Sequence, residues 1–372
     1  MSSQSRERDK ISTFERTIKT RVITNASELG ERLDLPRDVI EKADRASEAF
    51  PLLFPESLIP RVQRARIDDP ILLQFLPDER ELVKTPGFSE DPLCEWQEDK
   101  GSASAKDASN YPYILQKYAG RALILTTHSC AARCRFCFRR YFPKNRALFP
   151  IPTASRDVDD EKAISEYLRK ALAPIQTDES IRELVFSGGD PLMLANRELR
   201  GLLNYIKTIA HVKRVRFHSR VPVLAPARID DGFPAFDDFN ECDSPTPLIL
   251  HLSLHVNSPN EIDEAVARAL SRLRSKGYVL TSQTTLLRGV NDRWETLLDL
   301  YEKLINLGVV PYYLFQLDRV QGAAHWETPT DLGRSIIREL SARLPGYAVP
   351  RFSREIPGRP MKVDLSVEKE LD

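Results

Sequence analysis

The sequence has few cysteines, no excess of either charge and no long apolar run. Its 372 residues include five cysteines, and 54 basic residues balance 54 acidic ones. A neutral chain gives no reason to expect nucleic acid or an anionic membrane as a partner. No apolar run approaches the roughly 20 residues that span a bilayer, and the polar N-terminus lacks the apolar core of a secretory signal. We therefore expect a cytoplasmic protein.

Short apolar runs alternate with amphipathic stretches over most of the chain. Runs rich in β-branched residues predict six strands, at residues 122–127, 183–186, 215–218, 248–254, 278–281 and 310–315. Helical periodicity marks the stretches between most of them, at residues 161–173, 195–210, 259–277 and 293–308. This alternation predicts an α/β fold with a parallel sheet. Six units favour a TIM-like (β/α)6 barrel, partial or complete, with its functional groups at the C-terminal ends of the strands.

We expect the chain to divide into three regions. Residues 1–120 form a mostly helical N-terminal region, residues 121–325 the barrel core and residues 326–372 a C-terminal segment. Two stretches rich in polar and turn-forming residues, 97–112 and 230–247, predict surface loops.

Three of the five cysteines form one cluster. Cys130, Cys134 and Cys137 follow the first predicted strand with the spacing Cys-x3-Cys-x2-Cys, and a loop can bring thiolates so spaced to one metal centre. Three cysteine ligands on a 4Fe–4S cluster would leave one iron open to another chelator. Two alternatives stay open, namely a zinc site with His128 as the fourth ligand and three buried cysteines without a metal.

The cluster and the motifs around it resemble the lysine 2,3-aminomutase family of the radical S-adenosylmethionine (SAM) superfamily. The resemblance extends from about Pro60 to Lys362, and it is carried by THSCAARCRFCFRRYFP (127–143), FSGGDPLM (186–193), HSRVPVLAPARI (218–229), PYYLFQLDRVQGAAH (311–325) and PRFSREIPGRPMK (350–362). It implies an isomerase that moves an amino group between carbons 2 and 3 of lysine by means of a 5′-deoxyadenosyl radical. The match is with the short branch that supplies β-lysine for the modification of translation elongation factor P.

The resemblance implies three cofactors: a 4Fe–4S cluster on the three cysteines, SAM on its open iron, and pyridoxal 5′-phosphate. The residues expected to contact SAM follow three different strands, and they are Ser187, Gly188, Gly189, Asp190, His255 and Gln283. The two glycines would let the backbone approach a ligand. Alternatively, Asp190 before a proline predicts a helix N-cap, and a lone His or Gln more often makes internal hydrogen bonds.

Lys362 is the residue that the resemblance assigns to covalent binding of pyridoxal phosphate. Lys117 and Arg121 would pair with the phosphate of this cofactor. Pro360 and Met361 stand where the family usually has glycine, and we expect them to stiffen or crowd the turn before Lys362. On composition alone, Lys362 and Lys117 would instead be solvent-exposed lysines.

Charge determines the expected substrate. By the resemblance, Arg139 would bind the α-carboxylate through bidentate hydrogen bonds, and Asp318 and Glu355 would hold the ε-ammonium. Two buried carboxylates are costly unless a cation joins them, which suits lysine and disfavours glutamate. The alternative is that each acid makes an internal salt bridge.

The resemblance also sets the remaining expectations. Longer relatives carry zinc-binding cysteines in a C-terminal extension, whereas no cysteine follows Lys362, so we expect no zinc. Expected partners are lysine, a reductant such as flavodoxin or ferredoxin, a functional link to elongation factor P and a second copy in a homo-oligomer. The competing hypotheses are an aminomutase for another amino acid and a non-catalytic iron–sulfur protein.

Overall fold

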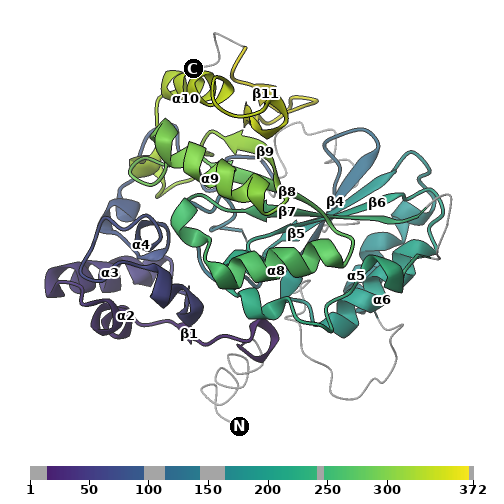
Figure 1. Ribbon diagram of the computed structural model, residues 1–372, viewed down its shortest axis with the longest axis horizontal. Helices are drawn as coiled ribbons and strands as arrows, with labels where there is room; N and C mark the ends of the chain where they lie inside the picture. The colour runs from purple at the N-terminus through teal and green to yellow at the C-terminus, as the bar shows by residue number, and fades with distance from the viewer. Residues whose placement is uncertain (1–14, 96–113, 143–163, 241–246, 368–372) are drawn as a thin grey trace.

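A nine-stranded sheet forms the centre of the computed structural model (Figure 1). The structure describes the chain in four ranges, residues 15–95, 114–142, 164–240 and 247–367. The predicted loop at 97–112 lies outside them. Seven strands run parallel: β4 (Arg121–Thr127), β5 (Glu183–Gly188), β6 (Arg214–Ser219), β7 (Ile249–His255), β8 (Val279–Thr285), β9 (Val310–Phe315) and β10 (Arg351–Arg354). Two short antiparallel strands form the edges, β3 (Ile114–Leu115) and β11 (Val363–Asp364).

The six central strands, β4 to β9, are those that the sequence predicts. Each pairs with the next one along the chain, as βαβ crossovers require. Among the described strands β3 and β11 stay at opposite edges of the sheet, so the sheet is open. The predicted α/β fold with a partial barrel is confirmed, and the complete barrel does not form.

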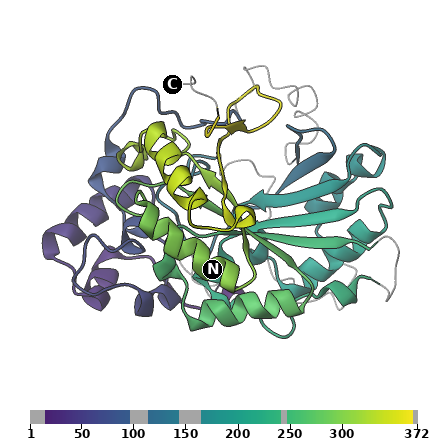
Figure 2. The ribbon, with the colours of Figure 1, turned by 45° about the horizontal axis from the view of Figure 1, so that its top comes forward.

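Helices cover the outer side of the sheet. They are α5 (Glu166–Leu172), α6 (Asn196–Lys207), α8 (Glu264–Ser275), α9 (Trp294–Asn306) and α10 (Thr330–Ser341). In α8, Val266, Leu270 and Leu273 form one buried stripe at helical spacing. Figures 1 and 2 show α8 and α9 lying along the same side of the strands.

In its described part, the connection between β6 and β7 has short helical turns, α7 (Val221–Leu224), η5 (Pro226–Arg228) and η6 (Phe236–Asp238). The sequence predicts a surface loop over residues 230–247, and the prediction is wrong for part of this stretch. Phe233 and Phe239 are almost fully buried in the core. Two aromatic side chains among acidic residues anchor the connection by hydrophobic burial, which its charged composition conceals.

The N-terminal residues pack against the sheet and share its core, which extends from Ile18 to Leu365. Their helices, purple in Figures 1 and 2, are α2 (Ala26–Leu33), α3 (Arg37–Ala49) and α4 (Leu72–Phe75), beside the paired strands β1 (Val22–Ile23) and β2 (Phe54–Pro55). The other 3-10 turns are η1 (Glu56–Arg61), η2 (Glu79–Leu82), η3 (Pro174–Gln176), η4 (Pro191–Met193), η7 (Pro259–Glu261), η8 (Ala324–Trp326) and η9 (Gly346–Ala348). None of the helices in the described ranges has the length and apolarity to cross a membrane.

Two glycines allow the end of β5 to touch the loop that follows β4. Gly188 has a φ of 107°, and a Cβ atom there would lie 2.9 Å from the carbonyl oxygen of Thr127. A Cβ atom on Gly189 would overlap the carbonyl oxygen of Ser129, to which the amide of Asp190 donates at 2.8 Å. The close approach that these glycines permit is therefore to the backbone that leads into the cysteine cluster.

Replacing Gly189 by alanine should destabilise the protein. The added methyl group forces the two backbones apart, and overpacking of this kind costs about 1–3 kcal/mol. Urea unfolding of the Gly189→Ala variant measures the loss. Gly346→Ala is the matched control, because nothing lies within 4 Å of a Cβ atom at that position. Equal unfolding free energies for the two variants would contradict the prediction.

Candidate active site

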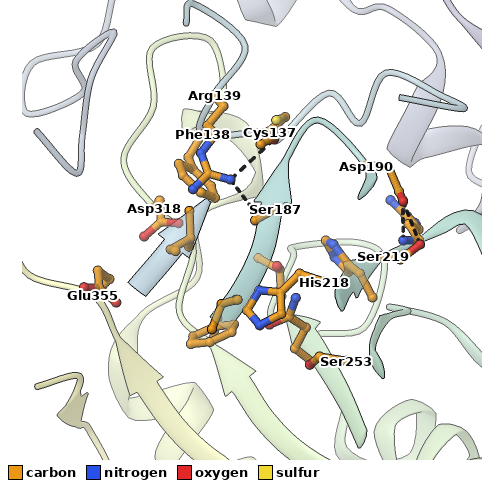
Figure 3. Close-up of a pocket in the computed structure, with 18 of the residues that line it drawn as sticks. Cys137, Phe138, Arg139, Ser187, Asp190, His218, Ser219, Ser253, Asp318 and Glu355 are labelled. Atoms are coloured by element: carbon orange, nitrogen blue, oxygen red, sulfur yellow. Dashed lines mark hydrogen bonds between the residues drawn. The ribbon is translucent and has the colours of Figure 1, made fainter. Parts of the chain in front are cut away.

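A chamber of about 320 Å³ opens along the inner side of the sheet, at the C-terminal ends of the parallel strands (Figure 3). Every residue that the sequence predicts for the site lines it. The three cysteines and Lys362, which are more than 220 positions apart in the sequence, thus face one space.

The cysteine loop presents three thiols to this chamber. Cys130, Cys134 and Cys137 all line it, and the amide of Cys137 donates to the carbonyl oxygen of Cys134 at 3.1 Å. Burial, reinforced by the neighbouring thiols, raises the pKa of Cys130 and brings the pKa of Cys137 to about 11. Iron ions would supply the positive charge that three buried thiolates need. The donor set therefore fits an iron–sulfur cluster.

The geometry disfavours zinc at this loop. Within the described ranges, no three His, Cys, Asp or Glu side chains come close enough to bind a single metal ion. A zinc site needs four ligands around one ion, whereas a 4Fe–4S cluster distributes its ligands over separate irons. His128, the expected fourth zinc ligand, is exposed, lies beside the ring of Phe142 and does not line the chamber.

A buried charge cluster fixes the cysteine loop to the N-terminal region. Arg135 donates to both carboxylate oxygens of Glu81 at 2.8 and 2.7 Å, and Arg140 donates to one of them at 2.8 Å. Both guanidinium groups lie over the ring of Phe50, at 4.6 and 4.5 Å. One glutamate in η2 thus holds the residues on either side of Cys137.

The carboxylate of Asp190 makes its hydrogen bonds within the protein. It accepts hydrogen bonds from the amides of Leu192, Arg220 and Val221 and from the hydroxyl of Ser219, at 2.7–3.1 Å (Figure 3). The first of these contacts is the predicted N-cap. Four donors fill the acceptor sites of a carboxylate, so the backbone of this segment, and not the Asp190 side chain, is left to contact a ligand.

His255 and Gln283 lie side by side on β7 and β8, in register with each other. The Nε2 atom of His255 is buried and has no partner in the described part of the chain. Burial, with the nearby Arg220 cation, lowers the pKa of His255 to about 3, so its ring is neutral. A buried ring nitrogen without a partner that faces a chamber is the feature that a bound ligand would satisfy.

Two further chamber residues share this feature, although neither was among the predicted site residues. His218 on β6 and Ser253 on β7 are in register. The Nε2 atom of His218 and the hydroxyl of Ser253 are both buried without a hydrogen-bond partner among the residues described. Figure 3 shows the two side chains on the same wall of the chamber.

Lys362 enters the chamber from the C-terminal segment. Its Nζ atom lies 2.7 Å from a carboxylate oxygen of Glu355 and 3.1 Å from the hydroxyl of Tyr118, which in turn donates to Glu355 at 2.6 Å. It also lies 4.9–5.9 Å from the ring centres of Tyr118, Tyr313 and Phe315. These rings give the Lys362 end of the chamber an aromatic lining that suits a planar cofactor.

The turn before Lys362 is not crowded. Pro360 and Met361 are both exposed, with 66% of Met361 accessible to solvent, so the expected crowding does not occur. Gly358 supplies the positive φ of this turn, at 80°. Lys362 itself is only partly accessible to solvent, which argues against the alternative that it is a solvent-exposed lysine.

Two more basic residues line the Lys362 end of the chamber. The guanidinium of Arg121 lies 5.3 Å from the ring centre of Tyr118 and has no hydrogen bond or ion pair to a described residue. The ammonium of Lys117 lies 3.8 Å from Glu355 and 4.0 Å from Glu95. A phosphate could pair with both cations.

Arg139 already has a carboxylate partner. Its Nε and Nη2 atoms donate to Glu95 at 2.6 and 2.9 Å, and Nη1 donates to the hydroxyl of Ser187 at 2.9 Å (Figure 3). The Glu95 side chain is only 5% exposed. No motif or spacing marks Glu95 in the sequence, so its role becomes visible only in the fold.

Asp318 is the unpaired acid of the chamber. None of the residues that the structure describes donates a hydrogen bond to its carboxylate, and the carbonyl oxygen alone accepts one, from Val320. Burial, with Glu355 and Glu95 close by, raises the pKa of Asp318 to about 7. A cation placed here would relieve this repulsion.

Comparisons with known proteins agree with this site. Residues 124–301 match the model of the radical SAM superfamily. The chain is 38% identical over 348 residues to L-lysine 2,3-aminomutase of Escherichia coli (strain K12), a match that covers 93% of each chain. It is 36% identical to the Haemophilus influenzae enzyme of that name, over 93% of this chain and 94% of the relative. Identity to the Clostridium subterminale enzyme is 34%, over 78% of this chain and 63% of that longer relative.

The open parallel sheet, with its cysteine loop after the first strand of the matched domain, defines a radical SAM protein. The similarity to full-length relatives goes further: the chain belongs to the L-lysine 2,3-aminomutase family. Membership confirms the predicted cofactor set, which is a 4Fe–4S cluster, SAM and pyridoxal 5′-phosphate.

The raised pKa of Asp318 predicts a pH-dependent cost to folding. An unfolded carboxyl titrates near 3.8, so between this value and about pH 7 the folded chain binds an extra proton. Stability therefore falls as the pH rises through this window. Without cofactors, Asp318→Asn should be more stable than the wild type at pH 8, by at most about 4 kcal/mol, and this advantage should shrink toward pH 5.

Urea unfolding between pH 5 and 8 measures this difference. Asp44→Asn, at an exposed position on α3, is the control and should leave the pH profile unchanged. A parallel pH profile for Asp318→Asn and wild type would show that Asp318 ionises normally in the folded protein.

Proposed function

We propose that this chain interconverts L-lysine and β-lysine, with Lys362 as the lysine that binds pyridoxal phosphate. The observation that carries the proposal is the shared chamber, which Lys362 lines together with Cys130, Cys134 and Cys137. Radical chemistry at one cofactor can act on a substrate held by another only if both face the same enclosed space. The relatives named L-lysine 2,3-aminomutase support lysine as the substrate.

The residues of the chamber would divide between the cluster with its SAM at one end and pyridoxal phosphate at the other. The cysteine loop would hold the cluster, and SAM would lie between that loop and the strand ends that carry Gly188, Gly189, His255 and Gln283. Lys117 and Arg121 would pair with the phosphate at the other end, near Lys362. When bound, these cofactors supply a hydrogen-abstracting radical and a conjugated ring on which an amino group can migrate.

Lys362 needs to lose a proton before its nitrogen can bond to a carbonyl carbon. The carboxylate of Glu355, 2.7 Å from Nζ, is placed to accept that proton and to pass it on to solvent, which returns Glu355 to its charged form. Although burial opposes it, the Lys362 ammonium lowers the pKa of Glu355. Loss of this ammonium would leave Glu355 without its main cation, beside the unpaired Asp318. The two acids would then attract a new cation, and the ε-ammonium of lysine fits that need.

The other end of the substrate would meet Arg139. Because Glu95 and Ser187 occupy the guanidinium, a substrate carboxylate can bind it only by replacing one of these partners. Apolar residues of the chamber wall, Leu123, Val185 and Leu317, keep the space between the two ends poor in water. Seclusion of this kind protects a radical from side reactions.

The decisive experiment is turnover by the anaerobically reconstituted and reduced protein with SAM and lysine, analysed for β-lysine. Lys362→Ala should abolish both turnover and the visible absorption of bound pyridoxal phosphate, while the iron content stays unchanged. Lys303→Ala, on the outer helix α9, is the matched control and should be fully active. Absence of β-lysine from a wild type that holds all three cofactors would reject the proposal and favour the non-catalytic alternative.

Substrate choice should depend on Asp318. Asp318→Asn removes the unpaired charge and should lower kcat/KM for lysine about tenfold to a hundredfold, the range for a hydrogen bond to a charged group. Asp318→Lys should abolish lysine turnover by repulsion. Competition between lysine and glutamate measures the preference, and an unchanged preference in both variants would favour another amino acid as the natural substrate.

We propose three finer points by resemblance to the short branch of the family. β-Lysine made by this chain would serve the modification of elongation factor P in the cytoplasm, and flavodoxin or ferredoxin would supply the electron. The division into residues 1–120, 121–325 and 326–372 would separate the N-terminal support, the radical-generating core and the segment that binds pyridoxal phosphate.

A further inference from the structure

Arg220, at the end of β6, contacts a cysteine of the cluster loop. Its Nη1 atom donates to the Sγ atom of Cys134 at 2.9 Å, and its side chain is only 5% exposed. The sequence motif HSRVP contains Arg220 but gives no role for it.

The arginine is fixed from several sides. Its Nη2 atom donates to Gln74 at 2.5 Å and to Glu261 at 2.7 Å, and the guanidinium lies 4.6 Å from the ring centre of Phe75. Its backbone amide donates to Asp190 at 2.7 Å. A long side chain held at this many points keeps one orientation, so its contact with Cys134 is a permanent part of the fold.

Glu261, which binds Arg220, is itself fixed by hydrogen bonds. Glu261 is fully buried and accepts hydrogen bonds from the amides of Asn257 and Ser258, both at 2.9 Å. The Nε atom of Arg220 is buried and has no acceptor among the described residues. One donor of the guanidinium is therefore without an acceptor in the described part of the chain.

The other cations near the loop are differently engaged. Arg135 and Arg140 are paired with Glu81, and Arg139 is paired with Glu95. Arg133 lies over the ring of Phe50 and donates to a backbone carbonyl. Within the described ranges, Arg220 is the cation that donates to a cysteine sulfur.

We propose that Arg220 tunes the iron–sulfur cluster by a charge-assisted hydrogen bond to its ligand Cys134. A reduced cluster carries one more negative charge than the oxidised cluster. A cationic donor to a ligand sulfur stabilises the reduced form and raises the reduction potential. The electron that SAM cleavage consumes would then be easier to deliver. This inference rests on the proposed function, because it requires Cys134 to be a cluster ligand.

The test is an anaerobic redox titration of the reconstituted protein without SAM, with the reduced cluster followed by electron paramagnetic resonance. Arg220→Gln removes the charge, and we expect about a tenfold lower ratio of reduced to oxidised cluster at a fixed potential, a shift of 59 mV for one electron. Arg220→Lys keeps the charge beside Glu261 but lacks the planar guanidinium group whose nitrogens donate to three acceptors. Its potential should lie between those of Arg220→Gln and wild type.

Arg61→Gln is the matched control. Arg61 is also buried, with 4% of its side chain exposed, and it donates to the carbonyl oxygen of Glu261 without contacting a cysteine. Its midpoint potential should equal that of wild type. If Arg220→Gln fails to hold iron, Arg220→Lys carries the test alone.

The outcomes separate the two proposals. Wild-type protein that binds no cluster would overturn the proposed function. A normal cluster with the same potential in wild type and in both Arg220 variants would overturn the tuning role alone, as would an equal shift in Arg61→Gln.

Discussion

The carboxylate of Asp190 is the contact on which the cluster end of the chamber depends. It joins the end of β5 to the end of β6 through three hydrogen bonds, and the amide of the same residue joins β5 to the loop after β4. Three strand ends are thereby fixed relative to one another. The cysteines follow the first of these strands, and Arg220 follows the third, so the contact between Arg220 and Cys134 is a consequence of how Asp190 is bonded.

A second constraint is the balance of charge inside the chamber. Arg139 is neutralised by Glu95 and Lys362 by Glu355, whereas the Asp318 carboxylate has no cation within hydrogen-bond distance among the described residues. Buried ions are stable only when paired, and the internal pairs therefore hold the chamber together before ligands arrive. Each of them stands where the resemblance places a ligand charge, so under the proposed function binding would exchange one ion pair for another.

The sequence predicted the repeated part of the fold well, because strand and helix periodicity are local properties. All six central strands and the helices α5, α6, α8 and α9 lie where hydrophobic patterning places them, whereas patterning did not predict α10. Patterning failed for part of the stretch 230–247, where the buried Phe233 and Phe239 outweigh the acidic residues around them. It also could not decide between an open and a closed sheet, since closure depends on pairing between edge strands that are far apart in the sequence.

The candidate site, like the fold, combines residues that could be predicted from the sequence with residues that only the structure reveals. Spacing predicted the cysteine cluster, whereas Lys362 and Asp318 were predicted by resemblance alone, and the structure places all five residues around one chamber. Glu95 and Tyr118 were not predicted, because no sequence feature marks a carboxylate or a phenol in a loop as part of a site. Their contacts appear only in the folded structure.

Resemblance predicted which residues line the chamber. It did not predict which residue each of them pairs with before ligands bind. The pairing of Glu355 illustrates why this matters. Resemblance assigns Glu355 to the substrate ammonium, and the structure pairs it with Lys362. These two roles are compatible only in succession, because one carboxylate in a poorly solvated space cannot neutralise two ammonium groups at once. Lys362 has to give up its charge before Glu355 can attract the substrate, so cofactor attachment would precede tight lysine binding. Under the proposed function, the order of binding would therefore follow from a single ion pair in the chamber.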